Sequence, residues 1–277
     1  MILIKAGERG PRVVLLQILL NRKKANPKLT VDGIWGPKTE KAVEAFRTSL
    51  NLKPRGPVDK DVFPALLKNE DVQVVDSVDM GSIKYKDKKT GQEQTMDSGQ
   101  QLAIMDLEAG GAHPLQMTRD PGQSVEHAVT KIINSVGTSS IALLRFHGHG
   151  NHGTWFTIAA GDPVDLKAAD PNAFAMLAAD WHGYLDLKHF DAHKLTLAKL
   201  TDHFAKFGSV EHHGCRVGTN SQALLRKLAE LWGVPVTAGR PDQYFGGGTS
   251  YAFEGATFTA FPPKTPSLHA WAKSVAE

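Results

Sequence analysis

The sequence contains a single cysteine among 277 residues and no long apolar run. One thiol excludes an internal disulfide framework and a structural zinc site built on paired cysteines. No stretch approaches the roughly 18 consecutive apolar residues that a membrane-spanning helix requires, so we expect no membrane insertion. The first five residues end in Lys5 and include no apolar run of signal length, so we also expect no secretory signal.

Charged residues are also scarce, at 22% of the chain, and the formal net charge is +3. With 41% hydrophobic residues, this composition excludes a disordered chain and a basic protein that coats polyanions. The small net charge hides a step along the sequence. Residues 1–70 carry 14 Lys and Arg against 7 Asp and Glu, whereas residues 71–277 carry 18 against 22. The step indicates two modules with different partners, although uneven solvated surfaces would also produce it.

Residues 1–70 predict a small all-α bundle of three short helices. Pro11 suits the first turn of a mostly buried helix. A tight loop with two glycines and a proline then surrounds Trp35. A second helix carries one apolar stripe from 42 to 50, and a third begins near Asp59 or Asp61.

The order of these motifs resembles the peptidoglycan-binding domain found beside bacterial cell-wall enzymes. The motifs that carry the resemblance are Gly7-x-Arg9-Gly10, Asp32-Gly33-Ile34-Trp35-Gly36-Pro37-x-Thr39, Ala42-Val43-x-x-Phe46 and Val58-Asp59. The resemblance covers nearly the whole module and implies that it binds peptidoglycan or another cell-wall polymer. Arg47 stands where the family usually has Gln, which changes the polarity near the expected groove.

Three residues are candidates for contact with the wall. An exposed indole offers an apolar face and one hydrogen-bond donor, so we expect Trp35 to contact sugar or peptide, with Asp32 and Arg47 as nearby polar groups. Formation of the turn would by itself also explain Asp32. The basic surplus favours an anionic polymer. We expect no nucleic acid as a partner, because the sequence has no aromatic–basic stripe. We also expect residues 1–70 to fold alone.

The rest of the chain predicts an α/β domain. Residues 71–100 form a linker, or a leading strand at 72–78 followed by a lysine-rich hairpin. Residues 101–277 alternate short apolar runs with helical patterns, which is typical of α/β domains on a largely parallel sheet. The expected strands lie at 102–107, 140–146, 210–213 and 234–238, and the expected helices at 124–136, 195–207 and 221–232.

Two chemically distinctive clusters follow expected strands. A glycine–histidine run from His147 to Gly153 follows one strand, and Cys215 follows another. In open parallel sheets, ligands bind beyond the carboxyl ends of the strands. A thiol becomes a nucleophile when a base such as imidazole takes its proton. Glycines beside both groups leave backbone N–H donors open to a developing oxyanion.

This arrangement resembles the caspase-like cysteine peptidase fold, in which one strand ends in His-Gly and a later strand ends in a Cys that precedes a helix. The resemblance covers roughly residues 100–260. It implies His149 as general base and acid, Cys215 as nucleophile, and the N–H groups of Gly150 and Cys215 as oxyanion donors. It also implies a protein or peptide substrate and neither cofactor nor metal. Two departures stand out: His149 and Cys215 are far apart in sequence for the family, and His147 is a second-choice base.

Two other functions remain open. The run His147-x-His149-x-Asn151-His152 is one residue away from the metal-binding pattern of the metallo-β-lactamase fold, which implies a zinc-dependent hydrolase. Asn151 replaces a carboxylate that this pattern requires, and a helix rather than sandwich strands is expected before it. The other function is a catalytically silent caspase-like scaffold that binds the wall.

The expected protein is therefore a bacterial hydrolase of two modules. A three-helix bundle anchors it to the cell wall, and a caspase-like α/β domain with a mostly parallel sheet cleaves peptide bonds with a Cys–His dyad. Without a signal peptide, we expect it in the cytoplasm until a dedicated export system or lysis brings it to the envelope.

Overall fold

A computed structural model describes most of the chain. The described residues are 3–80, 83–86, 93–96, 100–117, 124–150, 156–158, 164–170, 173–176, 184–244 and 251–276. Within them, no helix is both long and apolar enough to cross a membrane.

The N-terminal part is helical, as the sequence predicts. Its helices are α1 (Pro11–Arg22), α2 (Pro37–Ser49) and α3 (Phe63–Leu67). Each begins with a proline in its first turn, where the missing N–H has no helical partner to lose. The chain then enters the sheet at Gln73, close to the domain boundary expected near residue 70.

A six-stranded sheet forms the centre of the α/β part. Its strand order is β12–β11–β10–β5–β1–β4. Neighbouring strands are parallel except for β11 and β12, which pair antiparallel at one edge. The fold is thus α/β with a mostly parallel sheet. The strands are β1 (Gln73–Asp79), β4 (Leu115–Met117), β5 (Ile141–His147), β10 (Phe204–His213), β11 (Val236–Gly239) and β12 (Thr257–Ala260).

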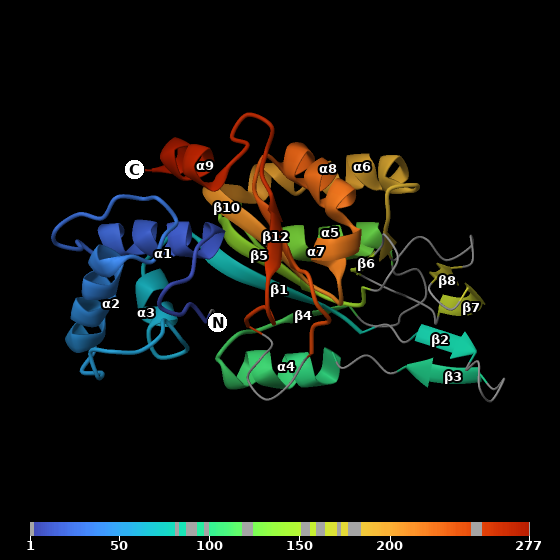
Figure 1. Cartoon of the computed structure of the whole chain (residues 1–277), viewed down its shortest axis with the longest axis horizontal. Coiled ribbons are helices and arrows are strands. Elements are labelled where there is room, and N and C mark those ends of the chain that lie inside the picture. Colours follow the sequence, from blue (N-terminus) through green and yellow to red (C-terminus); the bar gives the residue numbers. More distant parts are fainter. Residues whose placement is uncertain are drawn as a thin grey trace.

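Helices cover both faces of this sheet (Figure 1). One face packs its apolar side chains against α5 (Val125–Ser135), α6 (Phe190–Ala198) and α8 (Gln222–Trp232). The opposite face packs against α1 and α9 (Leu268–Val275). The helix α4 (Gln100–Ala109) lies beside β1, and the short helix α7 (Val217–Asn220) precedes α8.

Two smaller sheets complete the described structure. One has the order β3–β2–β7–β8, and the other pairs β6 with β9. Figure 1 shows β2, β3, β7 and β8 at the end of the molecule opposite the three N-terminal helices. The strands are β2 (Ile83–Lys86), β3 (Glu93–Met96), β6 (Phe156–Thr157), β7 (Val164–Asp170), β8 (Ala173–Met176) and β9 (Tyr184–Leu185).

Two sequence expectations about secondary structure are wrong. The run 102–107 is part of α4, with Ile104 and Leu107 buried and Met105 exposed, a spacing that fits a helix. The expected helix at 195–207 is divided: α6 ends at Ala198, and β10 already begins at Phe204. A short apolar run does not distinguish a buried strand from a buried helix, which explains the first error.

The helical domain shares its core with the sheet. Every residue of α1 from Pro11 to Leu20 is buried. One apolar cluster joins α1 to residues of β5, β10 and α9, namely Ala142, Leu143, Ala205, Phe207 and Trp271. The helical domain is therefore an integral layer of the fold and covers one face of the sheet.

Candidate active site and wall-binding residues

The register of β5 and β10 brings the two catalytic candidates to one edge of the sheet. The strands are parallel, and His147 lies opposite His213 at their carboxyl ends. Just beyond them, the N–H of Gly148 donates to the carbonyl of His213 at 3.3 Å. His149 and Cys215 each follow two residues after that paired position. The sequence expectation that two strand ends meet is consistent with this geometry.

The thiol of Cys215 is half-buried and protonated at neutral pH. Its Sγ donates to the carbonyl of Gln243 at 3.4 Å. Burial raises the pKa of the Cys215 thiol. The next residue, Arg216, has a left-handed backbone (φ 56°) and pairs with Asp242 through two hydrogen bonds of 2.9 Å. The turn that presents the thiol is therefore fixed against the segment 240–244.

His149 holds a neutral imidazole. Burial lowers the pKa of His149 to about 4. Its Nε2 is buried and has no hydrogen-bond partner among the described residues. The backbone of His149 is held by Thr157 of β6, whose Oγ1 accepts from the His149 N–H at 2.8 Å and whose N–H donates to the His149 carbonyl at 2.9 Å. The backbone position of His149 is thus defined, and its Nε2 forms no hydrogen bond with any described residue.

Gly150 lies directly against Cys215. A Cβ placed on Gly150 would stand 2.6 Å from the Cys215 carbonyl oxygen and 3.3 Å from its nitrogen. Any side chain at this position would push the two strand ends apart. The glycine therefore permits a close approach between the backbones of residues 150 and 215, whose N–H groups are the expected oxyanion donors.

His147 belongs to a different environment from His149. Its Nε2 lies 3.0 Å from Oδ1 of Asp76, and Arg145 donates to both oxygens of Asp76 at 2.7 and 2.8 Å. Burial lowers the pKa of His147. Burial alone would raise the pKa of Asp76, but Arg145 and the bond to His147 together hold it below its usual range.

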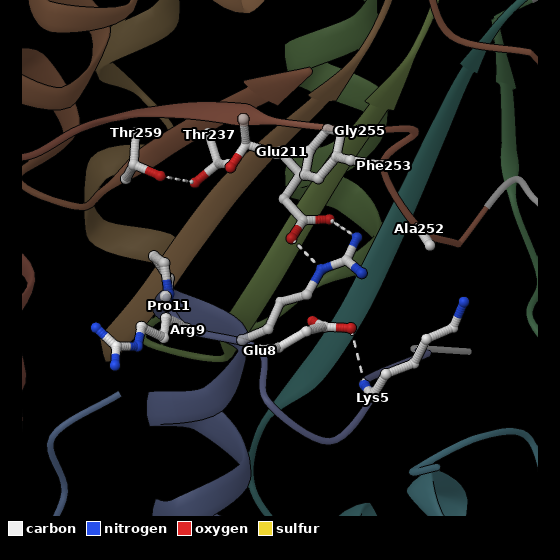
Figure 2. A pocket seen from close by; sticks show the side chains of 13 residues that line it. Lys5, Glu8, Arg9, Pro11, Glu211, Thr237, Ala252, Phe253, Gly255 and Thr259 are labelled. Carbon is white, nitrogen blue, oxygen red and sulfur yellow. Dashed lines mark hydrogen bonds and ion pairs between the residues drawn. The ribbon is translucent and has the colours of Figure 1, made fainter. Parts of the chain in front are cut away.

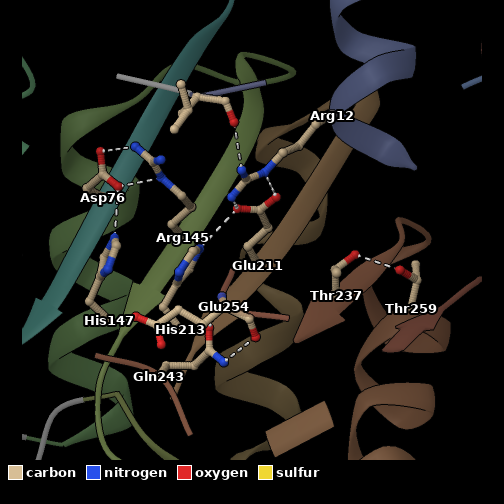
Figure 3. A network of polar contacts seen from close by, with 11 residues as sticks. Arg12, Asp76, Arg145, His147, Glu211, His213, Thr237, Gln243, Glu254 and Thr259 are labelled. Atoms are coloured by element: carbon tan, nitrogen blue, oxygen red, sulfur yellow. Dashed lines mark hydrogen bonds and ion pairs between the residues drawn. The ribbon is translucent and has the colours of Figure 1, made fainter. Parts of the chain in front are cut away.

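A second ion pair extends this network to the helical domain (Figure 3). Arg12 of α1 donates through Nε and Nη2 to the two carboxylate oxygens of Glu211 in β10. His213 lies 3.1 Å from the same carboxylate and stacks on His147, with 4.9 Å between ring centroids. Sequence reasoning missed this network. The sequence indicates this network only through charged residues that interrupt otherwise apolar segments.

His212 and His213 point to opposite faces of β10, as strand alternation requires. His212 packs against Phe156, with 3.8 Å between ring centroids, on the side of α5 and α8. His213 stacks on Phe253, at 4.3 Å, on the side of α1.

The expectation of an exposed indole at Trp35 is wrong. Trp35 is 5% exposed and belongs to the cluster that α1 shares with the sheet. Its Nε1 donates to the carboxylate of Glu40. Glycines on both sides allow the loop to turn the ring inward, where burial of a large aromatic surface stabilises the bundle.

Asp32 and Arg47 also support the bundle from within. Asp32 accepts from the side chain of Gln17 at 2.8 Å and from the N–H of Ile34 at 2.9 Å. Arg47 is buried, and it donates to the carbonyls of Lys53 at 2.8 Å and Pro57 at 2.6 Å. Arg47 therefore holds a loop and does not change the polarity of an exposed groove, which corrects the sequence expectation.

The zinc alternative depends partly on residues outside the described ranges. Asn151 and His152 fall in the segment 151–155, of which nothing is described. Among the described residues, no group of three His, Cys, Asp or Glu side chains is arranged to hold a metal ion. The alternative stays a prediction.

Comparison with known proteins identifies the helical domain alone. Residues 9–66 match the family model of the putative peptidoglycan binding domain. No curated protein and no solved structure matches the chain. The match supports peptidoglycan binding by α1 to α3 and the loops between them.

Proposed function

We propose that the protein is a cell-wall-binding cysteine peptidase with a caspase-like α/β domain. One observation carries the proposal: His149 and Cys215 follow paired positions of the adjacent parallel strands β5 and β10, and Gly150 abuts the Cys215 backbone. A helix follows the cysteine directly, which agrees with the resemblance drawn from the sequence. The protein would act at the bacterial envelope after export or lysis.

The resting groups suit general-base catalysis. Both the thiol and the imidazole are neutral at pH 7, so His149 takes the thiol proton as sulfur attacks the peptide carbonyl. The C–N bond is still intact in the resulting tetrahedral species, whose oxyanion accepts from the N–H groups of Gly150 and Cys215. His149 then gives its proton to the departing amine. A water, deprotonated by His149, hydrolyses the thioester and restores the thiol.

The surroundings of the two histidines favour His149 as the base over His147. The Nε2 of His147 is engaged by Asp76, and the His147 side chain is fully buried on the face that α1 covers. The Nε2 of His149 has no such partner. In this assignment, His147 holds the ionic network and His149 moves the proton.

One observation favours the second candidate, a catalytically silent scaffold that binds the wall. The raised pKa of Cys215 and its bond to the Gln243 carbonyl describe a thiol that nothing has ionised. Substrate binding would have to displace Gln243 or reorient the thiol before attack. The two candidates therefore differ in reactivity, and both agree with peptidoglycan binding.

The test is hydrolysis of peptide libraries and of purified peptidoglycan by four proteins: wild type, Cys215→Ala, His149→Ala and His147→Ala. The peptidase proposal expects losses of about a thousandfold or more for Cys215→Ala and His149→Ala, and a much smaller loss for His147→Ala of equal folded content. Cleavage that Cys215→Ala retains and a chelator abolishes would establish the zinc alternative. If wild type cleaves none of these substrates, the catalytically silent scaffold that binds the wall is the remaining candidate.

A further inference from the structure

A cavity of about 260 Å³ lies where the helical domain meets the sheet (Figure 2). The first residues of the helical domain, from Lys5 to Arg12, form one side. The opposite side comes from Glu211 and Thr237 in the sheet and from the segment 252–259. The cavity is small for a binding pocket, and a few residues of an extended peptide would fill it.

Arg12 and Glu211 form one wall of this cavity, and their charges neutralise each other. Arg12 donates to both oxygens of Glu211 and, through Nη1, to the carbonyl of Leu3 at 3.1 Å. The ring of Phe253 covers the guanidinium, with 5.3 Å from Cζ to the ring centroid. Because these charges are mutually neutralised, this wall is rigid and offers little net charge to a ligand.

The charged groups that could contact a ligand lie at the rim of the cavity. Lys5 and Arg9 are exposed, and neither forms an ion pair with any described residue. Between them, the half-buried carboxylate of Glu8 accepts from the backbone N–H of Lys5 at 2.8 Å. Burial raises the pKa of Glu8, because its carboxylate is partly desolvated. The rim therefore presents two unpaired cations beside one carboxylate.

Hydroxyl groups complete the opposite side of the cavity. The Oγ1 atoms of Thr237 and Thr259 lie 3.0 Å apart and share one hydrogen bond. One of the two hydroxyl hydrogens is not used in that bond, and the oxygens keep accepting capacity for an amide group. The site thus combines cations for a carboxylate, an anion for an amino group and hydroxyls for a peptide backbone.

We propose that this cavity binds the peptide stem of peptidoglycan by its free carboxylate. A carboxylate would contact Arg9, and the amino group of a diamino acid in the stem would face Glu8, which lies between Arg9 and Lys5. Arg9 to Arg12 belong to the part of the chain that matches the peptidoglycan-binding model, which ties the ligand to the wall. The inference rests on peptidoglycan binding and is independent of the chemistry of Cys215.

Calorimetric titration of full-length Cys215→Ala protein tests the proposal without cleavage of the ligand. Three ligands are compared: a stem peptide with free carboxylates, the same peptide amidated at its carboxylates, and glycan chains stripped of peptide. We expect the free stem peptide to bind, and amidation to weaken binding at least about tenfold, as expected when a charge-assisted contact is lost. Equal affinity for the amidated peptide, or binding of the stripped glycan alone, would overturn the proposal.

Variants locate the contact. Arg9→Ala in the Cys215→Ala background should weaken binding of the stem peptide about tenfold. Arg55→Ala removes an arginine of the same domain whose side chain is 93% exposed and lies outside the cavity, so it should leave affinity unchanged. Ala252→Leu fills the cavity without a change of charge and should also weaken binding. Unchanged affinity in both Arg9→Ala and Ala252→Leu, with thermal unfolding like the parent, would contradict the site. Failure of wild type to cleave peptides would affect the peptidase proposal alone.

Discussion

On the face of the central sheet that α5, α6 and α8 cover, the strands present Leu144, Phe146 and Val210 to an apolar core. On the face that α1 covers, the same strands β5 and β10 present Arg145 and Glu211, both almost fully buried. The first face needs only apolar partners of suitable size. The second face needs a cation at one position, and α1 supplies it as Arg12.

The difference indicates that the two halves of the chain form one structural unit. Apolar packing tolerates small displacements, whereas a buried carboxylate with two directed bonds fixes its partner. Removal of one member of a buried pair leaves an uncompensated charge, which is strongly unfavourable. Arg12 therefore holds the peptidoglycan-binding helices at a defined place on the sheet.

The largest expected effect comes from division of the chain at residue 70. Residues 71–277 alone should be insoluble or lack a cooperative thermal transition, because the apolar surface of β5 and β10 loses α1. Residues 1–70 alone should be less helical than in the whole protein, contrary to the sequence expectation of independent folding. Circular dichroism of both pieces checks this. If residues 71–277 unfold in a sharp transition at the same temperature as the whole protein, the sheet folds without α1 and the prediction is wrong.

Arg12→Ala should produce the next largest effect, about 3–5 kcal/mol of lost unfolding free energy in urea titrations. Arg12→Met combined with Glu211→Leu should recover much of the loss, since no unpaired charge remains. Arg55→Ala, an exposed arginine of the same domain, should cost less than about 0.5 kcal/mol. Equal losses of unfolding free energy for Arg12→Ala and Arg55→Ala would contradict the claim that the Arg12–Glu211 ion pair holds α1 on the sheet.

Acid should weaken the folded state through its buried histidines. The pKa of His149 is lowered to about 4 and that of His213 to about 3, both from an ordinary value of 6.5. Unfolding lets them take up protons, so stability is fully present above about pH 6.5 and is lost as the pH falls toward 4. His149 alone contributes on the order of 3 kcal/mol across that interval.

Urea titrations at pH 7.5 and pH 5 measure this dependence. His149→Gln should show a smaller difference between the two pH values than wild type. Ile132→Val, which shortens a buried side chain of α5 in the apolar core, should cost about 1 kcal/mol at both pH values. A wild-type unfolding free energy that is the same at pH 7.5 and pH 5 would contradict the burial of these groups.

Local signals in the sequence predicted much of the fold. Pro11 predicted where α1 begins, and Ser124, at the start of the expected helix 124–136, caps α5 by accepting from the His127 N–H at 3.3 Å. Pro37 was assigned to the loop around Trp35, whereas it is the first residue of α2. Alternation of helical and apolar segments predicted the parallel sheet. The placement of His149 and Cys215 after successive apolar runs suggested that they lie at one edge of that sheet.

Features that depend on distant partners were not predictable. Trp35 could be read as exposed because its loop gives no sign of the core beneath it. Arg12 and Glu211 are separated by 199 positions, and neither one's local pattern indicates the other. A single sequence shows a charge inside an apolar segment, but its partner becomes evident only when the strands are placed.

The position of α1 also affects the order in which the chain can fold. A ribosome releases α1 before β10, which ends at His213, so one side of the helix stays uncovered until the sheet has been made. At about 5–20 residues per second, synthesis from residue 70 to that strand takes roughly 7–30 s. For that time the nascent helical domain exposes the apolar side chains of α1 that later pack against β5 and β10, and we expect a chaperone to bind this surface during synthesis.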